Sequence, residues 1–157
     1  MSNFPIRRLR RLRRTEKIRD LVQEVSLSPS DLICPVFVEE GIQTKKQIQS
    51  MPAIERMPLS DIVNEVDAIA ELGIPAVMLF GIPQNKDDEG TSAYVDHGIV
   101  QKAISEIRKN FGDKIVVMAD VCLCQYTSSG HCGLVKDEII DNDSSICLLY
   151  TSDAADE

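Results

Sequence analysis

The chain has 157 residues, of which 43% are apolar, and a formal net charge of −8. This length and composition suffice for one sizeable hydrophobic core and exclude a largely disordered protein. No apolar run approaches the ~18 residues of a membrane-crossing helix. Five cysteines without an apolar signal segment favour a reducing, cytoplasmic compartment, where clustered cysteines more often bind metal or act in catalysis than form disulfides.

Positive charge is concentrated at the N-terminus. Residues 1–19 carry a net charge of +7, so the rest of the chain carries −15. We predict that residues 1–14 form a basic arm, which could bind nucleic acid, an anionic membrane or an acidic protein surface, or could serve as a targeting peptide. Because the rest of the chain is itself acidic, a second copy of the same protein is the favoured partner, ahead of nucleic acid or membrane.

The first helix and strand are predicted next along the chain. Thr15 is a good N-cap for a short helix with one apolar stripe, formed by Ile18, Leu21, Val22 and Val25. Residues 32–38 form a predicted strand, in which Pro35 is a signal for local irregularity or an early end. Residues 41–58 show no periodic pattern and are predicted to form a loop.

Two further helix–strand units follow. Ser60 is the predicted N-cap of a helix that ends at Gly73. Residues 74–80 are apolar throughout, as in a strand of a parallel sheet that is buried on both faces. Helical spacing recurs over residues 100–111, and a last apolar strand covers residues 114–119.

Strands and helices that alternate in this way are typical of right-handed βαβ units. The units could form an open doubly wound sheet or the start of a (β/α)₈ barrel. No Gly-rich phosphate motif follows the first strand, and candidate metal ligands follow the last one, which favours the barrel. Eight such units need roughly 320 residues. We therefore predict that residues 15–144 are the N-terminal portion of a TIM barrel, truncated in this chain.

Three cysteines follow the last predicted strand: Cys122, Cys124 and Cys132. Because side chains alternate along a strand, Cys122 and Cys124 should point the same way, and a turn through Gly130 can bring Cys132 beside them. Three thiolates fit zinc (Zn²⁺) with an open fourth position. Spacing alone leaves two alternatives open, namely apolar packing and a disulfide between Cys124 and Cys132.

The string DVCLCQYTSSGHCG at residues 120–133 resembles the metal-binding segment of the porphobilinogen synthase (5-aminolevulinate dehydratase) family. Segments of the same family, in the same order, are RRLRR, DLICPVFVEEG, SMPAIERMP, LGIPAVMLFGIP and KDDEGTSAY. The resemblance covers about residues 5–143. Within the motif, Gln125 replaces the usual proline and Ser129 replaces a common histidine. We expect residues 145–157 to be an aberrant tail.

The resemblance implies a lyase of haem and tetrapyrrole biosynthesis that condenses two molecules of 5-aminolevulinate to porphobilinogen with loss of water. It implies a zinc-type member in which Zn²⁺ is held by Cys122, Cys124 and Cys132. Asp120 is the expected catalytic carboxylate, and Ser129 and His131 are expected to line the substrate pocket. The resemblance also implies a homo-oligomer, commonly an octamer, in which the N-terminal arm wraps a neighbouring subunit.

The resemblance also implies two active-site lysines. At least one of them forms a Schiff base with the substrate ketone. None of the chain's eight lysines lies in an apolar strand that would lower the pKa of its amine. We therefore expect a fragment that lacks these lysines and is inactive alone. The alternative function is a non-catalytic zinc-binding α/β module. A thiol redox protein is less favoured, because C-x-C is a poorer redox spacing than C-x-x-C.

Overall fold

A parallel sheet forms the centre of the computed structural model, which describes residue 6 and residues 9–155, with side chains as far as Thr151. The five strands lie in the order β2-β3-β1-β4-β5. All neighbours are parallel except β2 and β3. The strands are β1 (Ile33–Glu39), β2 (Lys46–Gln47), β3 (Glu55–Met57), β4 (Ala76–Ile82) and β5 (Val116–Ala119).

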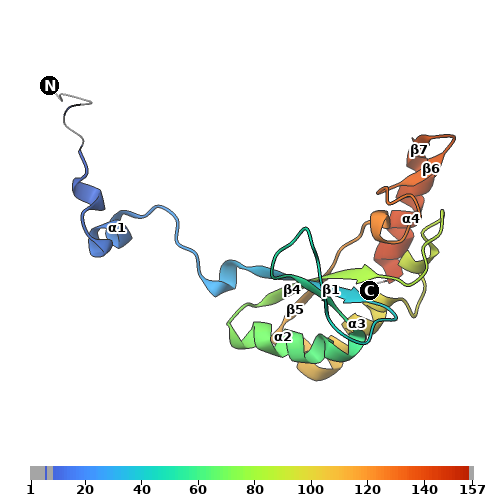
Figure 1. Cartoon of the computed structure of the whole chain (residues 1–157), viewed down its shortest axis with the longest axis horizontal. Coiled ribbons are helices and arrows are strands. Elements are labelled where there is room, and N and C mark those ends of the chain that lie inside the picture. Colours follow the sequence, from blue (N-terminus) through green and yellow to red (C-terminus); the bar gives the residue numbers. More distant parts are fainter. Residues whose placement is uncertain (1–5, 7–8, 156–157) are drawn as a thin grey trace.

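Two helices cover one face of this sheet (Figure 1). They are α2 (Ile62–Glu71) and α3 (Ile99–Phe111), which are the helices expected between the predicted strands. The core between the sheet and the helices is apolar and almost free of solvent contact. Its members include Val36, Val38, Val77, Leu79, Ile62, Val66, Ala103 and Ile107. The predicted alternation of strand and helix is therefore confirmed.

The opposite face of the sheet carries aromatic side chains. Phe37 of β1 and Phe80 of β4 stack with ring centroids 4.9 Å apart and an interplanar angle of 18°. Because side chains alternate along a strand, these rings point away from α2 and α3. The segment from Gln47 to Met51 lies over the same face and forms one wall of a cavity with the two rings. This face is therefore where a ligand can reach the sheet.

Three local predictions were wrong. Pro35 does not make β1 irregular or short, since all seven residues from Ile33 to Glu39 pair with β4 in continuous register. Ser60 is not an N-cap, because it lies inside a 3₁₀ turn (Leu59–Asp61) and its hydroxyl donates to the Asp61 carboxylate at 3.1 Å. The predicted loop at residues 41–58 contains β2 and β3. Strands of two and three residues are too short to show a periodic pattern. By contrast, Gly73 ends α2 with φ +77°, as predicted.

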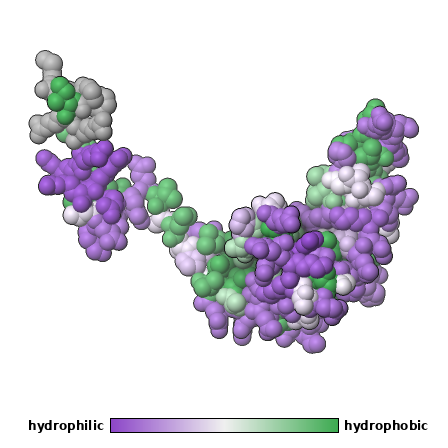
Figure 2. Space-filling view, in the orientation of Figure 1, coloured by the Kyte–Doolittle hydropathy of each residue, from purple (hydrophilic) through white to green (hydrophobic). Residues whose placement is uncertain are grey.

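The N-terminal segment stands apart from the sheet (Figure 1). A 3₁₀ turn (Arg11–Arg13) leads to α1 (Glu16–Val22), where the Thr15 hydroxyl accepts from the Ile18 backbone N–H at 3.3 Å, as a cap should. The helix ends before Val25. Figure 2 shows hydrophilic surface over this segment and apolar side chains along the connection to the body. Of the predicted arm at residues 1–14, residues 1–5 and 7–8 lie outside the described residues.

A hairpin and a helix form the C-terminal part. The hairpin joins β6 (Leu134–Lys136) to β7 (Ile139–Asp141), and its two turn residues have positive φ, as a tight hairpin requires. The last helix, α4 (Asn142–Ala155), includes most of residues 145–157, which the sequence analysis expected to be an aberrant tail. Among the helices in the described part of the chain, none is both long and apolar enough to cross a membrane.

Truncation of Leu79 tests the packing of the core between the sheet and the helices. It is 1% exposed, whereas Leu72 at the end of α2 is 69% exposed. We expect Leu79→Ala to lower the free energy of unfolding by about 2–5 kcal/mol, because the truncation leaves a cavity between the sheet and the helices. Leu72→Ala, the matched control, should change it by about 0.5 kcal/mol or less. Urea unfolding followed by circular dichroism gives both values. Equal changes in the free energy of unfolding for the two substitutions would contradict the buried position of Leu79.

Candidate metal centre and active site

Three thiols gather just beyond the C-terminal end of β5. The sulfurs of Cys122, Cys124 and Cys132 all lie within 4.8 Å of one another, and the first two are 3.2 Å apart. They are the only group of three or more potential metal-ligating residues found within the described residues. The sequence prediction that these three cysteines converge is confirmed.

The path of the chain differs from the predicted strand. The strand β5 ends at Ala119, Cys122 is extended, and Leu123–Gln125 form a 3₁₀ turn. Alternation along a strand is therefore not what places Cys122 and Cys124 on one side. Instead, the turn folds the chain back and brings the second sulfur over the first.

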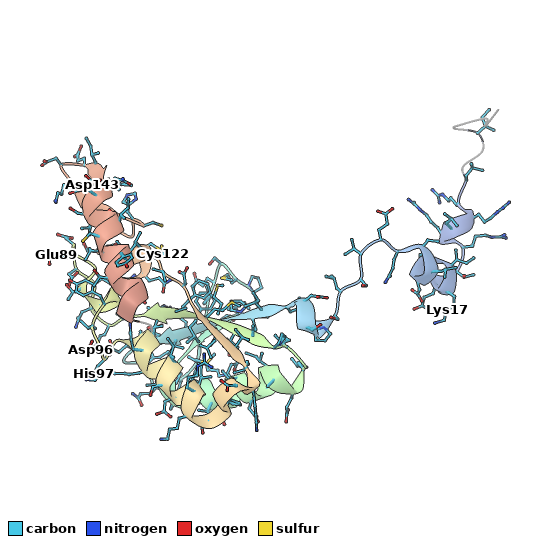
Figure 3. The ribbon with its side chains drawn as sticks, turned by 180° about the vertical axis from the view of Figure 1, so that it is seen from behind. Lys17, Glu89, Asp96, His97, Cys122 and Asp143 are labelled. Atoms are coloured by element: carbon cyan, nitrogen blue, oxygen red, sulfur yellow. The ribbon has the colours of Figure 1, made fainter. Side chains whose placement is uncertain are left out.

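Buried side chains anchor this turn. Leu123 is fully buried and Tyr126 is 6% exposed, and Leu148 and Leu149 of α4 pack against the cluster that these two residues belong to. The backbone N–H groups of Tyr126 and Thr127 each donate to the Leu123 carbonyl at 2.9 Å. Figure 3 shows Cys122 beside α4, which agrees with this packing. The turn that carries two thiols is thus held by the core rather than by solvent-exposed contacts.

Thr127 brings the third thiol into place. Its side chain is 1% exposed, and its hydroxyl donates to the His131 carbonyl at 3.0 Å, next to Cys132. Gly130 adopts φ +70° between these residues, which reverses the chain. The backbone N–H of Ser128 donates to the Asp87 carbonyl at 2.9 Å, so the loop after β4 supports the same segment.

The electrostatics of the cluster favour a cation. Burial, together with the neighbouring Cys122 thiol, raises the pKa of Cys124 to about 12. A hydrogen bond with Cys122 raises the pKa of Cys132. Three adjacent thiolates repel one another, so a divalent cation is needed to hold all three ionised.

The arrangement fits zinc. A tetrahedral zinc with bonds of about 2.3 Å to each sulfur needs sulfurs about 3.8 Å apart. The Cys122 and Cys124 sulfurs are 3.2 Å apart, and no two of the three sulfurs are more than 4.8 Å apart, so small shifts reach this value. All five cysteines are free, so the alternative disulfide between Cys124 and Cys132 is not formed.

A cavity of about 760 Å³ lies beside the cluster. Asp120 and Cys124 line it together with the stacked rings of Phe37 and Phe80. Asp120 directly follows β5, and its backbone N–H donates to the Leu79 carbonyl at 3.2 Å. The cavity thus combines a carboxylate, a candidate metal ligand and an aromatic wall, which suits a small substrate with polar and apolar parts.

The two other predicted pocket residues lie elsewhere. Ser129 and His131 are exposed and are not among the residues that line the cavity. They interact with each other, since the His131 backbone N–H donates to the Ser129 side-chain hydroxyl at 3.3 Å. Their part in substrate binding stays a prediction.

Most residues that line the cavity were not identified as site residues from the sequence, among them Gln125, Phe37 and Phe80. Gln125 had been noted only as a departure from a motif, yet its side-chain amide donates to the Asp120 carboxylate at 2.6 Å. No local pattern signals a contact of this kind. The pairing of Phe37 with Phe80 depends on strand register, which a single sequence does not specify.

Comparison with known proteins identifies the family. The family model described as delta-aminolevulinic acid dehydratase matches residues 6–155. The chain belongs to this family. It is 54% identical over 142 residues to the delta-aminolevulinic acid dehydratase of Bacillus subtilis (strain 168), covering 90% of this chain and 44% of that protein. It is 48% identical to that of Methanothermus sociabilis, covering 93% and 45%.

A solved structure is also similar to this chain. It is the delta-aminolevulinic acid dehydratase (porphobilinogen synthase) of Toxoplasma gondii ME49 in complex with the reaction product porphobilinogen. The TM-score is 0.84 at 34% identity, and the match covers 95% of this chain and 44% of that one. The parallel sheet of this family member is therefore the N-terminal part of a (β/α)₈ barrel, as predicted.

The matched range has two consequences. The chain spans less than half the length of the relatives named above. The family match also extends to residue 155, so it includes most of the segment at residues 145–157 that sequence reading set apart as a tail.

Cys124 provides a test of the cluster without metal. Because its pKa is raised to about 12, its thiol should be almost entirely protonated at pH 8, and its thiolate fraction should still be rising at pH 11. We expect its alkylation rate by iodoacetamide in metal-free chain to increase tenfold per pH unit throughout this range. Peptide mass spectrometry at each pH measures the rate. A plateau near pH 9 would show that neither burial nor the neighbouring Cys122 thiol raises the pKa of Cys124.

Proposed function

We propose that this chain is the metal-binding part of a porphobilinogen synthase, a lyase that condenses two molecules of 5-aminolevulinate to porphobilinogen with loss of water. The observation that supports this most is the placement of three convergent thiols and Asp120 beside one cavity. Family membership and the porphobilinogen complex of the Toxoplasma gondii protein support the same substrate class. A non-catalytic zinc module accounts for the thiols but gives no role to Asp120 or the cavity.

The proposed cofactor is one zinc ion held by Cys122, Cys124 and Cys132. When bound, zinc supplies Lewis-acid polarisation of a substrate carbonyl or amine at its open position. The protein's part is to hold the three sulfurs in place through the buried turn at Leu123 and the hydrogen bond from Thr127 to the His131 carbonyl.

Asp120 is the proposed acid–base or amine-binding group. Its carboxylate lines the cavity next to Cys124, so it can accept a hydrogen bond from a substrate amine or take a proton from it. The stacked rings of Phe37 and Phe80 form an apolar wall that can pack against the methylene carbons of the substrate and exclude water from it.

The amine that forms a Schiff base must come from elsewhere in the full-length enzyme. None of the cavity-lining residues within the described part of the chain is a lysine. We place the two lysines implied by the family in the half of the relatives' length that this chain does not span. On this proposal the 157-residue chain alone does not turn over substrate.

We also propose that the N-terminal segment binds a second copy of the protein in a homo-oligomer. Leu21, Val25 and Leu27 are 84%, 75% and 82% exposed on a segment that stands away from the sheet (Figure 1). Apolar side chains at such exposure are suited to burial against a partner. The opposite charges of residues 1–19 and the rest of the chain favour contact between copies. The five free cysteines are consistent with a cytoplasmic location.

A chimeric enzyme tests the function. It joins residues 6–155 of this chain to the remaining C-terminal part of the Bacillus subtilis relative. We expect the chimera to bind one zinc per chain and to convert 5-aminolevulinate to porphobilinogen, measured by the colour reaction with Ehrlich's reagent. Cys132→Ala should lower the activity by about 100-fold or more, because the metal contributes several kcal/mol of charge stabilisation.

Cys147→Ala is the matched control, because this exposed cysteine lies outside the cluster. It should retain both zinc and activity. A folded chimera that binds zinc but makes no porphobilinogen would contradict the proposed function and favour the non-catalytic module. Full activity in the Cys132→Ala chimera would contradict the assigned ligand set.

A further inference from the structure

One contact at the cavity has no part in the function proposed above. The Nε2 amide of Gln125 donates to Oδ2 of Asp120 at 2.6 Å, in a partly buried setting. Hydrogen bonds to an ionised acceptor are shorter and stronger than those between neutral groups. The amide adds no charge, so the carboxylate keeps its own charge, which an ion pair with lysine or arginine would neutralise.

The bond closes a loop that contains two of the three thiols. It joins residue 120 to residue 125, so Cys122 and Cys124 lie inside it. Each end of the loop has its own anchor. The Asp120 N–H donates to the Leu79 carbonyl of β4, and the turn that ends at Gln125 is held by the buried Leu123. The side-chain contact therefore links the sheet edge to the buried turn.

The orientation of the Gln125 amide is set by Asp120. Its Oε1 is buried and has no hydrogen-bond partner among the described residues, so no donor in that part of the chain holds the oxygen end of the amide. Turning the amide over would place Oε1 against the carboxylate, which is repulsive. This bond uses Oδ2 of Asp120, so it does not occupy the other carboxylate oxygen, Oδ1, of this cavity-lining residue.

We propose that Gln125 is a positioning residue, which fixes the Asp120 carboxylate toward the cavity and ties it to the loop that carries Cys122 and Cys124. The inference rests on the proposed function only for what Asp120 does to substrate. The contact itself can be tested without any activity. Proline, which the resembling motif usually has at this position, has no side-chain donor for such a bond.

Side-chain amide signals in ¹⁵N–¹H spectra of the 157-residue chain provide that test. The Gln125 signals are assigned by their loss in Gln125→Met. We expect a downfield, slowly exchanging amide proton for Gln125, in contrast to Gln49, an exposed glutamine that lines the same cavity. Asp120→Ala should move this signal to the position of the exposed glutamines. A Gln125 signal that already coincides with that of Gln49, or that ignores Asp120→Ala, would overturn the proposal.

Cobalt binding tests the link to the thiol loop. Titration with Co²⁺, followed by the thiolate-to-cobalt absorption, reports both affinity and ligand geometry. We expect Gln125→Met to weaken Co²⁺ binding roughly tenfold, at the lower end of the loss caused when a group that orients a ligand is removed. Gln49→Met should leave the affinity unchanged. Equal affinities for Gln125→Met and the unchanged chain would overturn the coupling, whether or not the chimera makes porphobilinogen.

Discussion

The burial of one short turn is the constraint on which the candidate site depends. Leu123 is fully buried, and its carbonyl accepts hydrogen bonds from two successive backbone N–H groups, those of Tyr126 and Thr127. This fixes Cys122 and Cys124 on one side of the turn. Thr127, itself buried, then holds the backbone next to Cys132. Three thiols on a mobile loop would separate, because each would be better solvated apart.

The sheet gives this turn its place beside a cavity. The parallel register of β4 and β5 sets Asp120 at the strand ends, next to the face that carries Phe37 and Phe80. The helices occupy the other face (Figure 1), so the core and the site use opposite sides of the same strands. Barrel enzymes place their chemistry at the C-terminal ends of strands, and this placement of the thiols and Asp120 follows that rule.

Much of the architecture could be predicted from the sequence, because its strongest signals are local. Residues 74–80 are apolar throughout, and this pattern predicted a strand there. The strand β4 runs from Ala76 to Ile82, and its residues on the face opposite the helices are mostly half-buried rather than buried. Gly73 ends its helix because only glycine adopts φ +77° without strain. The short strand β3 was missed because a three-residue strand gains its stability from pairing with β1, which is a distant segment.

The site shows the same division between local and distant signals. The three cysteines were correctly predicted to converge, but a strand was wrongly assumed to be the cause. The 3₁₀ turn that brings them together depends on the burial of Leu123 in a cluster that packs with α4. The spacing of the cysteines in the sequence does not reveal that packing. The Gln125–Asp120 bond was not predicted, since a glutamine five residues from an aspartate has no preferred contact with it.

X-ray absorption at the zinc edge tests the central claim most directly. The zinc-loaded 157-residue chain should show three sulfur neighbours at about 2.3 Å and one nitrogen or oxygen neighbour, which is the open position. In Cys132→Ala the sulfur count should fall to two. A shell of nitrogen and oxygen only, or four sulfurs, would contradict a three-thiolate centre with room for substrate.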